Sequence, residues 1–155
     1  MRYIKFFGKT KKSNDNDTND KTVLFVCVEN AGRSQMAEGF FKKYAPKGFK
    51  VQSAGTKPVF QINPIVVEAM KEVGIDIIKQ KSKELTDEMI RDSDSVVNMG
   101  CMDKSFCPTI WLPKVIEWNL EDSKGKSIEK VREIRDEIEK RVKEVVAEIT
   151  TTTQL

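Results

Sequence analysis

Short apolar runs alternate with longer mixed segments from residue 22 onwards. The runs at about 22–27, 49–53, 95–99 and 115–118 are rich in Val, Ile and Phe and have the length of strands. Helices are predicted between and after them, at about 34–44, 63–74, 86–90 and 127–149. Strands that alternate with helices predict an α/β fold in three layers, a four-stranded parallel sheet with helices on both faces.

Apolar stripes and capping residues define the two clearest helices. The helix at 63–74 has Asn63 as N-cap, Pro64 in its first position and Gly74 after its end. Its predicted buried stripe is Ile65, Val66, Ala69, Met70 and Val73. The last helix repeats apolar residues every three or four positions, at Ile128, Val131, Ile134, Ile138, Val142, Val145 and Ile149. Its opposite face carries Lys, Arg and Glu, so one side is expected to be buried.

The chain divides into one domain and two short ends. Residues 1–20 are mostly polar and are predicted to be a disordered extension, residues 21–150 form the single domain, and residues 151–155 form a disordered tail. The aromatic group Tyr3, Phe6 and Phe7 either contacts a membrane or partner or belongs to a frayed end.

Charge and composition exclude several classes of protein. The net charge of +3 is too small to indicate nucleic acid, and no apolar run is long enough to span a membrane or to form a signal peptide. The three cysteines are typical of reactive thiols in a reducing cytoplasm, where we expect the protein to reside. The chain has no histidine, which excludes Ser-His and Cys-His catalysis and argues against a zinc site. No cofactor is predicted.

The segment Cys27 to Ser34 carries the strongest chemical signal. It follows a buried strand and opens a helix, with five residues between Cys27 and Arg33. Such a turn directs backbone N–H groups inward, the helix N-terminus adds positive charge, and Arg33 can bind two oxygens of a tetrahedral anion. We expect the Cys27 thiol to be a thiolate that Ser34 stabilises. The alternative is a buried structural cysteine at the end of a strand.

Two further groups should lie beside this turn. Cys101 and Cys107 follow the third strand, and ligands bind at the carboxyl ends of such strands. Three interpretations are open. The two cysteines can form a disulfide, they can be thiols without a function, or they can bind a metal, for which Cys27 is the only other soft ligand. Asp122, after the fourth strand, is either a general acid or a solvated carboxylate that caps the last helix.

Residues 26–38 resemble the active-site loop of thioredoxin-coupled arsenate reductases, which share the fold of low-molecular-weight protein tyrosine phosphatases. The similarity continues at residues 53–55, 63–64, 70–76, 99–101, 107–108, 118–122 and 135–138, and covers about 22–149. Two features depart from the family: Ser123 stands where a proline usually follows the acid, and residues 1–20 have no counterpart.

The resemblance implies a role for each residue. Cys27 attacks arsenic, and Ser34 tunes its thiolate. Asp122 is the general acid, and Cys101 and Cys107 successively relay the disulfide, which thioredoxin reduces. The oxyanion-binding residues are Val28, Glu29, Asn30, Ala31, Gly32 and Arg33. In some relatives a potassium ion lies near the equivalents of Asn30, Glu38, Ser53 and, here, Glu84.

Three functions remain open from the sequence. The first is arsenate reduction by the three cysteines, with arsenate as the small-molecule ligand and thioredoxin as the partner. The second is a tyrosine or small phosphomonoester phosphatase, which needs only Cys27, Arg33 and Asp122. The third is a non-enzymatic redox sensor that uses the thiol pair and the N-terminal extension.

Overall fold

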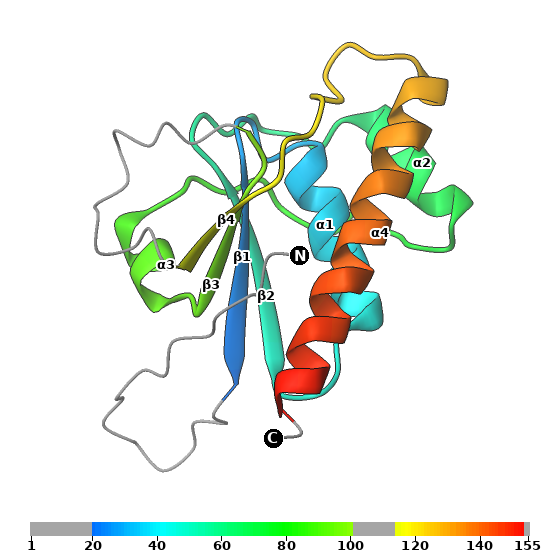
Figure 1. The fold of residues 1–155 in the computed structure, drawn as a ribbon. Coiled ribbons are helices and arrows are strands. Elements are labelled where there is room, and N and C mark those ends of the chain that lie inside the picture. Colours follow the sequence, from blue (N-terminus) through cyan, green and yellow to red (C-terminus); the bar gives the residue numbers. More distant parts are fainter. Residues whose placement is uncertain (1–19, 101–113, 154–155) are drawn as a thin grey trace.

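A four-stranded parallel sheet forms the centre of the protein. The computed structural model describes residues 20–100 and 114–153. The strands are β1 (Lys21–Cys27), β2 (Phe49–Gly55), β3 (Ser95–Asn98) and β4 (Val115–Glu117), arranged in the order β2-β1-β3-β4 (Figure 1). The helices are α1 (Arg33–Tyr44), α2 (Pro64–Glu72), α3 (Asp87–Asp92) and α4 (Ile128–Thr153). All strand pairs are parallel.

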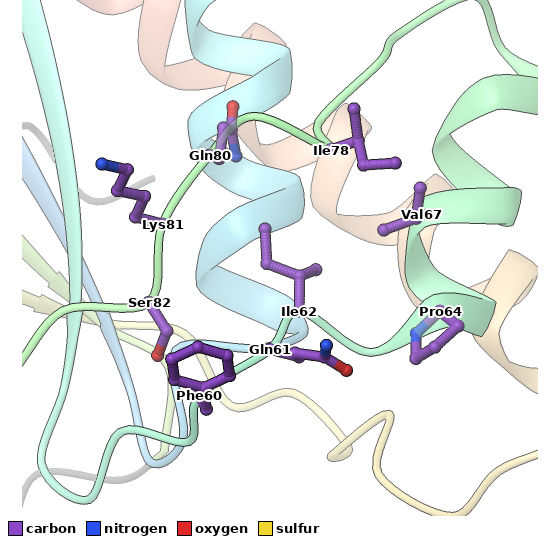
Figure 2. A pocket seen from close by; sticks show the side chains of 9 residues that line it. All are labelled: Phe60, Gln61, Ile62, Pro64, Val67, Ile78, Gln80, Lys81 and Ser82. Carbon is purple, nitrogen blue, oxygen red and sulfur yellow. The ribbon is translucent and has the colours of Figure 1, made fainter.

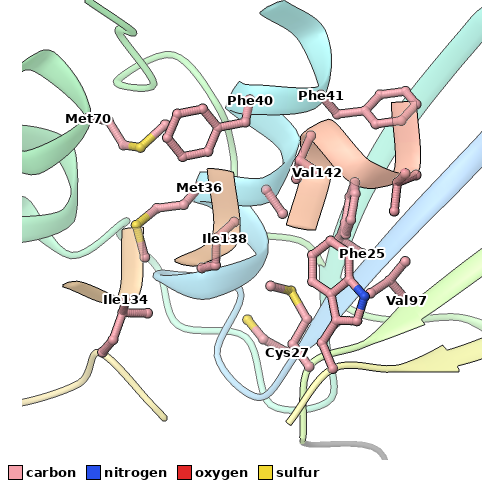
Figure 3. Close-up of a cluster of buried hydrophobic side chains, with 14 of the residues drawn as sticks. Phe25, Cys27, Met36, Phe40, Phe41, Met70, Val97, Ile134, Ile138 and Val142 are labelled. Carbon is pink, nitrogen blue, oxygen red and sulfur yellow. The ribbon is translucent and has the colours of Figure 1, made fainter. Parts of the chain in front are cut away.

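Helices cover both faces of the sheet, as the sequence predicted. Successive residues of a strand point to opposite faces, and β1 directs Phe25 and Cys27 into the larger core and Leu24 and Val26 into the smaller one. The larger core lies between the sheet and α1, α2 and α4, with Phe40, Phe41, Met70, Ile138 and Val142 among its members (Figure 3). The smaller core lies under α3 on the other face (Figure 1). The predicted three-layer α/β fold is therefore confirmed.

The carboxyl ends of β1 and β3 mark the place where a ligand is expected. The chain runs from β1 to β2 on one side and then returns to β3 on the other side of β1. A parallel sheet leaves a crevice where its strand order reverses in this way. Cys27 ends β1, and Met99 and Gly100 follow β3, so both segments open onto this crevice.

The last helix is longer than its sequence pattern predicted. It was expected to end at about residue 149 with a disordered tail from 151, but α4 continues to Thr153. The hydroxyl of Thr150 donates to the Val146 carbonyl over 2.7 Å, and that of Thr151 donates to the Ala147 carbonyl over 2.9 Å. These bonds turn the polar threonines back onto the helix, so the prediction was wrong for residues 151–153.

The buried stripe of α2 is narrower than predicted. Val66, Ala69 and Met70 are fully buried, whereas Ile65 is 36 % exposed. Asn63 caps the helix as expected, since its side chain accepts a hydrogen bond from the Ile65 amide. The second helical residue after a cap points away from the sheet here, which places Ile65 at the surface.

The predicted N-terminal extension lies, up to residue 19, outside the described residues, as do Cys101 and Cys107. Among the residues that are described, no helix is both long and apolar enough to cross a membrane.

Candidate active site

The backbone carbonyl groups in the loop between β1 and α1 accept hydrogen bonds from other segments of the protein. We call residues 27–33 the oxyanion loop. Each carbonyl from residue 27 to residue 32 accepts a hydrogen bond of 2.8–3.2 Å. The donors, from residue 27 to residue 32, are the Thr56, Lys57 and Val59 amides, the Gln35 side chain, and the Asn63 and Met36 amides. The Ser82 hydroxyl adds a second bond to the Glu29 carbonyl at 3.0 Å. The turn is thus fixed from outside along its whole length.

Because these carbonyls face outward, the N–H groups of the same peptides face inward. In a trans peptide the C=O and N–H bonds point in opposite directions, and the structure has no cis peptide among its described residues. The one amide of the loop that reaches the thiol is that of Asn30, 3.2 Å from Cys27 Sγ. Asn30 has a φ of 51°, a conformation that asparagine tolerates better than most residues. Amides that point inward from a turn in this way are able to bind an anion.

The Cys27 thiol lies at the bottom of this loop and is buried (Figure 3). Its sulfur is 2.7 Å from the Ser34 hydroxyl. The Asn30 side chain donates to the same hydroxyl over 2.7 Å, which leaves the Ser34 proton free to point at the sulfur. The sulfur therefore has one hydroxyl and one backbone amide within hydrogen-bond distance.

Arg33 connects the oxyanion loop to two other segments of the crevice. Its guanidinium is buried. The Nη1 atom donates to the carbonyl of Met99, which follows β3, and to the carbonyl of Leu120 over 3.1 Å. Its Nη2 atom lies 3.6 Å from the Asp122 carboxylate. The fixed planar fork can therefore hold an anion between the thiol and the acid.

Asp122 belongs to the acid loop, which we define as residues 119–127. Its side chain is 51 % exposed, and its Oδ1 atom accepts from the Lys124 amide over 3.0 Å. The cap of α4 is Ser127, whose hydroxyl accepts from the Lys130 amide at 3.3 Å, so Asp122 does not cap that helix. One carboxylate oxygen is turned towards Arg33 and the crevice, where a general acid is needed.

The acid loop packs directly on the oxyanion loop. Ser123 is buried, and a Cβ atom on Gly32 would lie 2.2 Å from its hydroxyl. A small cavity of about 30 Å³ remains between the two loops, lined among others by Cys27, Arg33 and Asp122. Gly32 thus allows the close approach that brings Cys27, Arg33 and Asp122 to one point.

Gly55, at the end of β2, supports the oxyanion loop from behind. A Cβ atom there would lie 2.5 Å from the Val28 carbonyl oxygen and 2.8 Å from the Asn30 nitrogen, both in the backbone. Gly55→Ala is therefore expected to displace the loop, to lower Tm, and to reduce turnover about 10- to 100-fold. Thermal unfolding and aryl phosphate hydrolysis measure the two effects. Lys57→Ala, an exposed change that keeps the amide bonded to Val28, should leave both unchanged. A Gly55→Ala enzyme with normal turnover would contradict the role of this contact.

Two glutamines, which the sequence did not single out as functional, also hold the oxyanion loop. Gln35 is buried in the first turn of α1 and donates to the carbonyls of Asn30 and Lys81, at 2.9 and 3.0 Å. Gln80 donates in turn to the side chain and carbonyl of Gln35. The one feature of the sequence that could have indicated this role is that Gln35 is a polar residue on the buried side of a helix.

A wide cavity lies outside the crevice that contains Cys27. It has a volume of about 690 Å³ and is lined by Phe60, Gln61, Ile62, Pro64, Val67, Ile78, Gln80, Lys81 and Ser82 (Figure 2). Phe60 is 98 % exposed and Ile78 is 62 % exposed. Neither Cys27 nor Arg33 lines it, so it is an apolar groove beside the site rather than the site itself.

The four residues named for a possible potassium site meet only part of what such a site needs. Glu38 is buried, and the buried Ser53 hydroxyl has no hydrogen-bond partner among the described atoms, as a cation site would require. However, Asn30 Oδ1 already accepts from the Lys83 amide over 2.8 Å, and Glu84 is exposed. Burial lowers the pKa of the Lys83 amino group, while the charge of Glu38 favours its protonated form. Glu38 is already paired with Lys42, whose Nζ atom lies 3.7 Å from its carboxylate.

Potassium is therefore expected to have no specific effect on stability. An ion that binds only the folded chain raises Tm with its concentration. We expect KCl and NaCl at equal ionic strength to give Tm values within about 1 °C of each other. Thermal unfolding of the full chain in each salt measures this. A potassium-specific rise in Tm would support the possible site, and Lys42→Met, which removes the charge paired with Glu38, is the matched variant.

The sequence matches one protein family over almost the whole described chain. The family is described as low molecular weight phosphotyrosine protein phosphatase, and the match covers residues 22–155. An arsenate reductase of Brevibacillus brevis is 39 % identical over 126 residues, which are 81 % of this chain and 93 % of that one. An arsenate reductase of Halalkalibacterium halodurans is also 39 % identical, over 132 residues, 81 % of this chain and 94 % of that one.

Solved structures of related proteins share the fold. A thioredoxin-dependent arsenate reductase of Corynebacterium glutamicum superimposes with a TM-score of 0.73 at 38 % identity, covering 86 % of this chain and 63 % of that longer one. An arsenate reductase in its phosphate-binding state gives a TM-score of 0.74 at 36 % identity, covering 83 % and 98 %. An arginine phosphatase of Geobacillus stearothermophilus gives 0.78 at 24 % identity, covering 86 % and 96 %, which is a likeness of fold alone.

Proposed function

This chain belongs to the low-molecular-weight phosphotyrosine protein phosphatase family, and on that premise we propose that it is an arsenate reductase supplied with electrons by thioredoxin. The observation that carries the proposal is the buried Cys27 sulfur under a loop of outward carbonyls, with Arg33 and Asp122 on the open side. Relatives at 39 % identity carry the same activity in their names.

The first step is attack by the Cys27 thiolate on arsenic. Inward amides and Arg33 hold the oxygens of the arsenate, so the nucleophile and its target are already adjacent. One oxygen must leave as water, and Asp122, 3.6 Å from the Arg33 guanidinium, supplies the proton. The product is a covalent Cys27–arsenate adduct with arsenic still in its +5 state.

The second step transfers two electrons to arsenic. In this proposal the Cys101 thiolate attacks the Cys27 sulfur, the sulfur–arsenic bond breaks, and its electron pair leaves with arsenic as arsenite in the +3 state. The two sulfurs are left as a Cys27–Cys101 disulfide. Cys107 then attacks Cys101, which frees Cys27 and leaves a Cys101–Cys107 disulfide for reduction by thioredoxin.

Arg33 also holds the end of the described chain after β3 beside the anion site. It donates to the Met99 carbonyl, and a Cβ atom on Gly100 would lie 3.5 Å from its Nη1 atom. The chain therefore passes beside the anion site immediately before Cys101. Gly100 has a φ of +90°, which only glycine adopts readily, so this turn is built into the sequence.

Phosphomonoester hydrolysis is the second candidate, favoured by the same three side chains. Water can hydrolyse a thiophosphate at Cys27, so phosphate chemistry needs no further thiol. A coupled assay separates the two functions: NADPH consumption by thioredoxin reductase, thioredoxin and this protein, with and without arsenate, beside aryl phosphate hydrolysis. Arsenate-dependent NADPH consumption supports the reductase. Hydrolysis without it would make the phosphatase the main function.

A further inference from the structure

An ion pair joins the two catalytic loops across the mouth of the site. The Lys124 ammonium, in the acid loop, lies 2.5 Å from a carboxylate oxygen of Glu29, in the oxyanion loop. The hydrogen bond to Glu29 is the main cause of a raised pKa at Lys124. Both residues line the small cavity that also contains Cys27 and Asp122. The two partners are 95 positions apart in the sequence.

We propose that the Glu29–Lys124 pair positions the general acid over the nucleophile and cancels the charge of Glu29 at the anion site. This rests on the proposed function, since it concerns the same catalytic crevice. A carboxylate in a loop that binds oxyanions repels them, and an adjacent ammonium removes most of that repulsion. The pair is thus a condition for having Glu29 in this loop at all.

The position of Lys124 couples the pair to the acid. Its backbone amide donates to Asp122 Oδ1 over 3.0 Å, so movement of Lys124 moves the carboxylate. Glu29 is held by three bonds on its own carbonyl and side chain, from Val59, Ser82 and Lys124. The acid loop is therefore anchored at one side to a rigid turn.

The other side of the acid loop is anchored independently. Glu121 pairs with Lys126 at 3.3 Å and with Lys130 of α4 at 3.0 Å, and hydrogen bonds from both lysines lower the pKa of its carboxyl group. These residues do not line the cavity. When Lys126 is replaced, Glu121 keeps its pair with Lys130, so this side of the loop stays anchored. Lys126 is thus a control of the same residue type and charge in the same loop.

The test uses three variants of the full chain, Glu29→Gln, Lys124→Met and the double variant, with Lys126→Met as control. Aryl phosphate hydrolysis gives kcat and KM, and inorganic phosphate gives an inhibition constant. Lys124→Met leaves Glu29 uncompensated and should weaken phosphate binding about three- to tenfold, whereas Glu29→Gln should strengthen it by a similar factor. The double variant should return close to the original affinity.

The value of kcat measures the positioning of the general acid separately from the affinity for phosphate. All three variants break the pair, so each should lose kcat about three- to tenfold, including the double variant with restored affinity. Lys126→Met should stay within about twofold of the original enzyme in both constants. The affinity differences should shrink at high salt, while the loss of kcat should not.

Several outcomes would overturn the proposal. If neither constant changes in any variant, the pair is an ordinary surface contact. If Lys126→Met behaves like Lys124→Met, only net charge matters. If the original enzyme shows no arsenate-dependent NADPH consumption, the proposed function fails. Phosphate-induced shifts in Tm still test the opposite effects of Glu29→Gln and Lys124→Met on anion binding, whether or not the enzyme hydrolyses aryl phosphate.

Discussion

Cys27→Ser is expected to abolish both arsenate reduction and aryl phosphate hydrolysis, with turnover reduced at least about 10⁴-fold. A serine hydroxyl at this site is protonated at neutral pH, and no histidine exists anywhere in the chain to remove its proton. The contacts with Ser34 and Asn30 that favour a thiolate cannot replace a base. The measurement is arsenite formation and aryl phosphate turnover at substrate saturation.

The same variant should still bind anions. The anion site consists of backbone amides and Arg33, and the serine oxygen fits the space of the sulfur without disturbing them. Inorganic phosphate should therefore raise Tm in Cys27→Ser about as much as in the original chain. Residual turnover well above background would show that a second nucleophile exists. Loss of the phosphate effect would show that Cys27 holds the loop together, rather than only reacting in it.

The sequence predicted the fold because its signals were local. Each strand and helix follows from a short run of residues, such as the Asn63 cap with Pro64 in the next position. The end of α4 was missed because threonine is a poor helix former whose side chain can nevertheless bond to the preceding turn. Local patterns do not show which of these two tendencies prevails.

The chemistry of Cys27, Arg33 and Ser34 was likewise readable from one short segment. The outward bonds that fix the oxyanion loop were not, since the donors come from Lys57, Val59 and Asn63, far along the chain. Ion pairing between Glu29 and Lys124 could not be read either, because charged residues are too common to suggest a partner 95 positions away. Contacts of this kind depend on how β1, β2 and the acid loop converge in the folded chain.

Cys107→Ser is expected to stop the proposed relay after one cycle. The variant can still bind arsenate and form the Cys27–Cys101 disulfide, but it has no thiol to reopen that bond. We therefore expect about one arsenite per enzyme, and no further turnover with thioredoxin. Mass spectrometry of the product, digested without reductant, should show Cys27 linked to Cys101.

Cys101→Ser is the matched control for the order of the two thiols. It removes the first attacker, so arsenic stays bound to Cys27 in its +5 state and no arsenite should form. Both variants should keep aryl phosphate hydrolysis, which needs only Cys27, Arg33 and Asp122. The order rests on the proposed relay, in which Cys101 attacks first, and the described chain after β3 reaches the anion site at Met99. Continuous arsenite production by Cys107→Ser with thioredoxin would refute the relay, and an equal single release of arsenite from both variants would reverse its order.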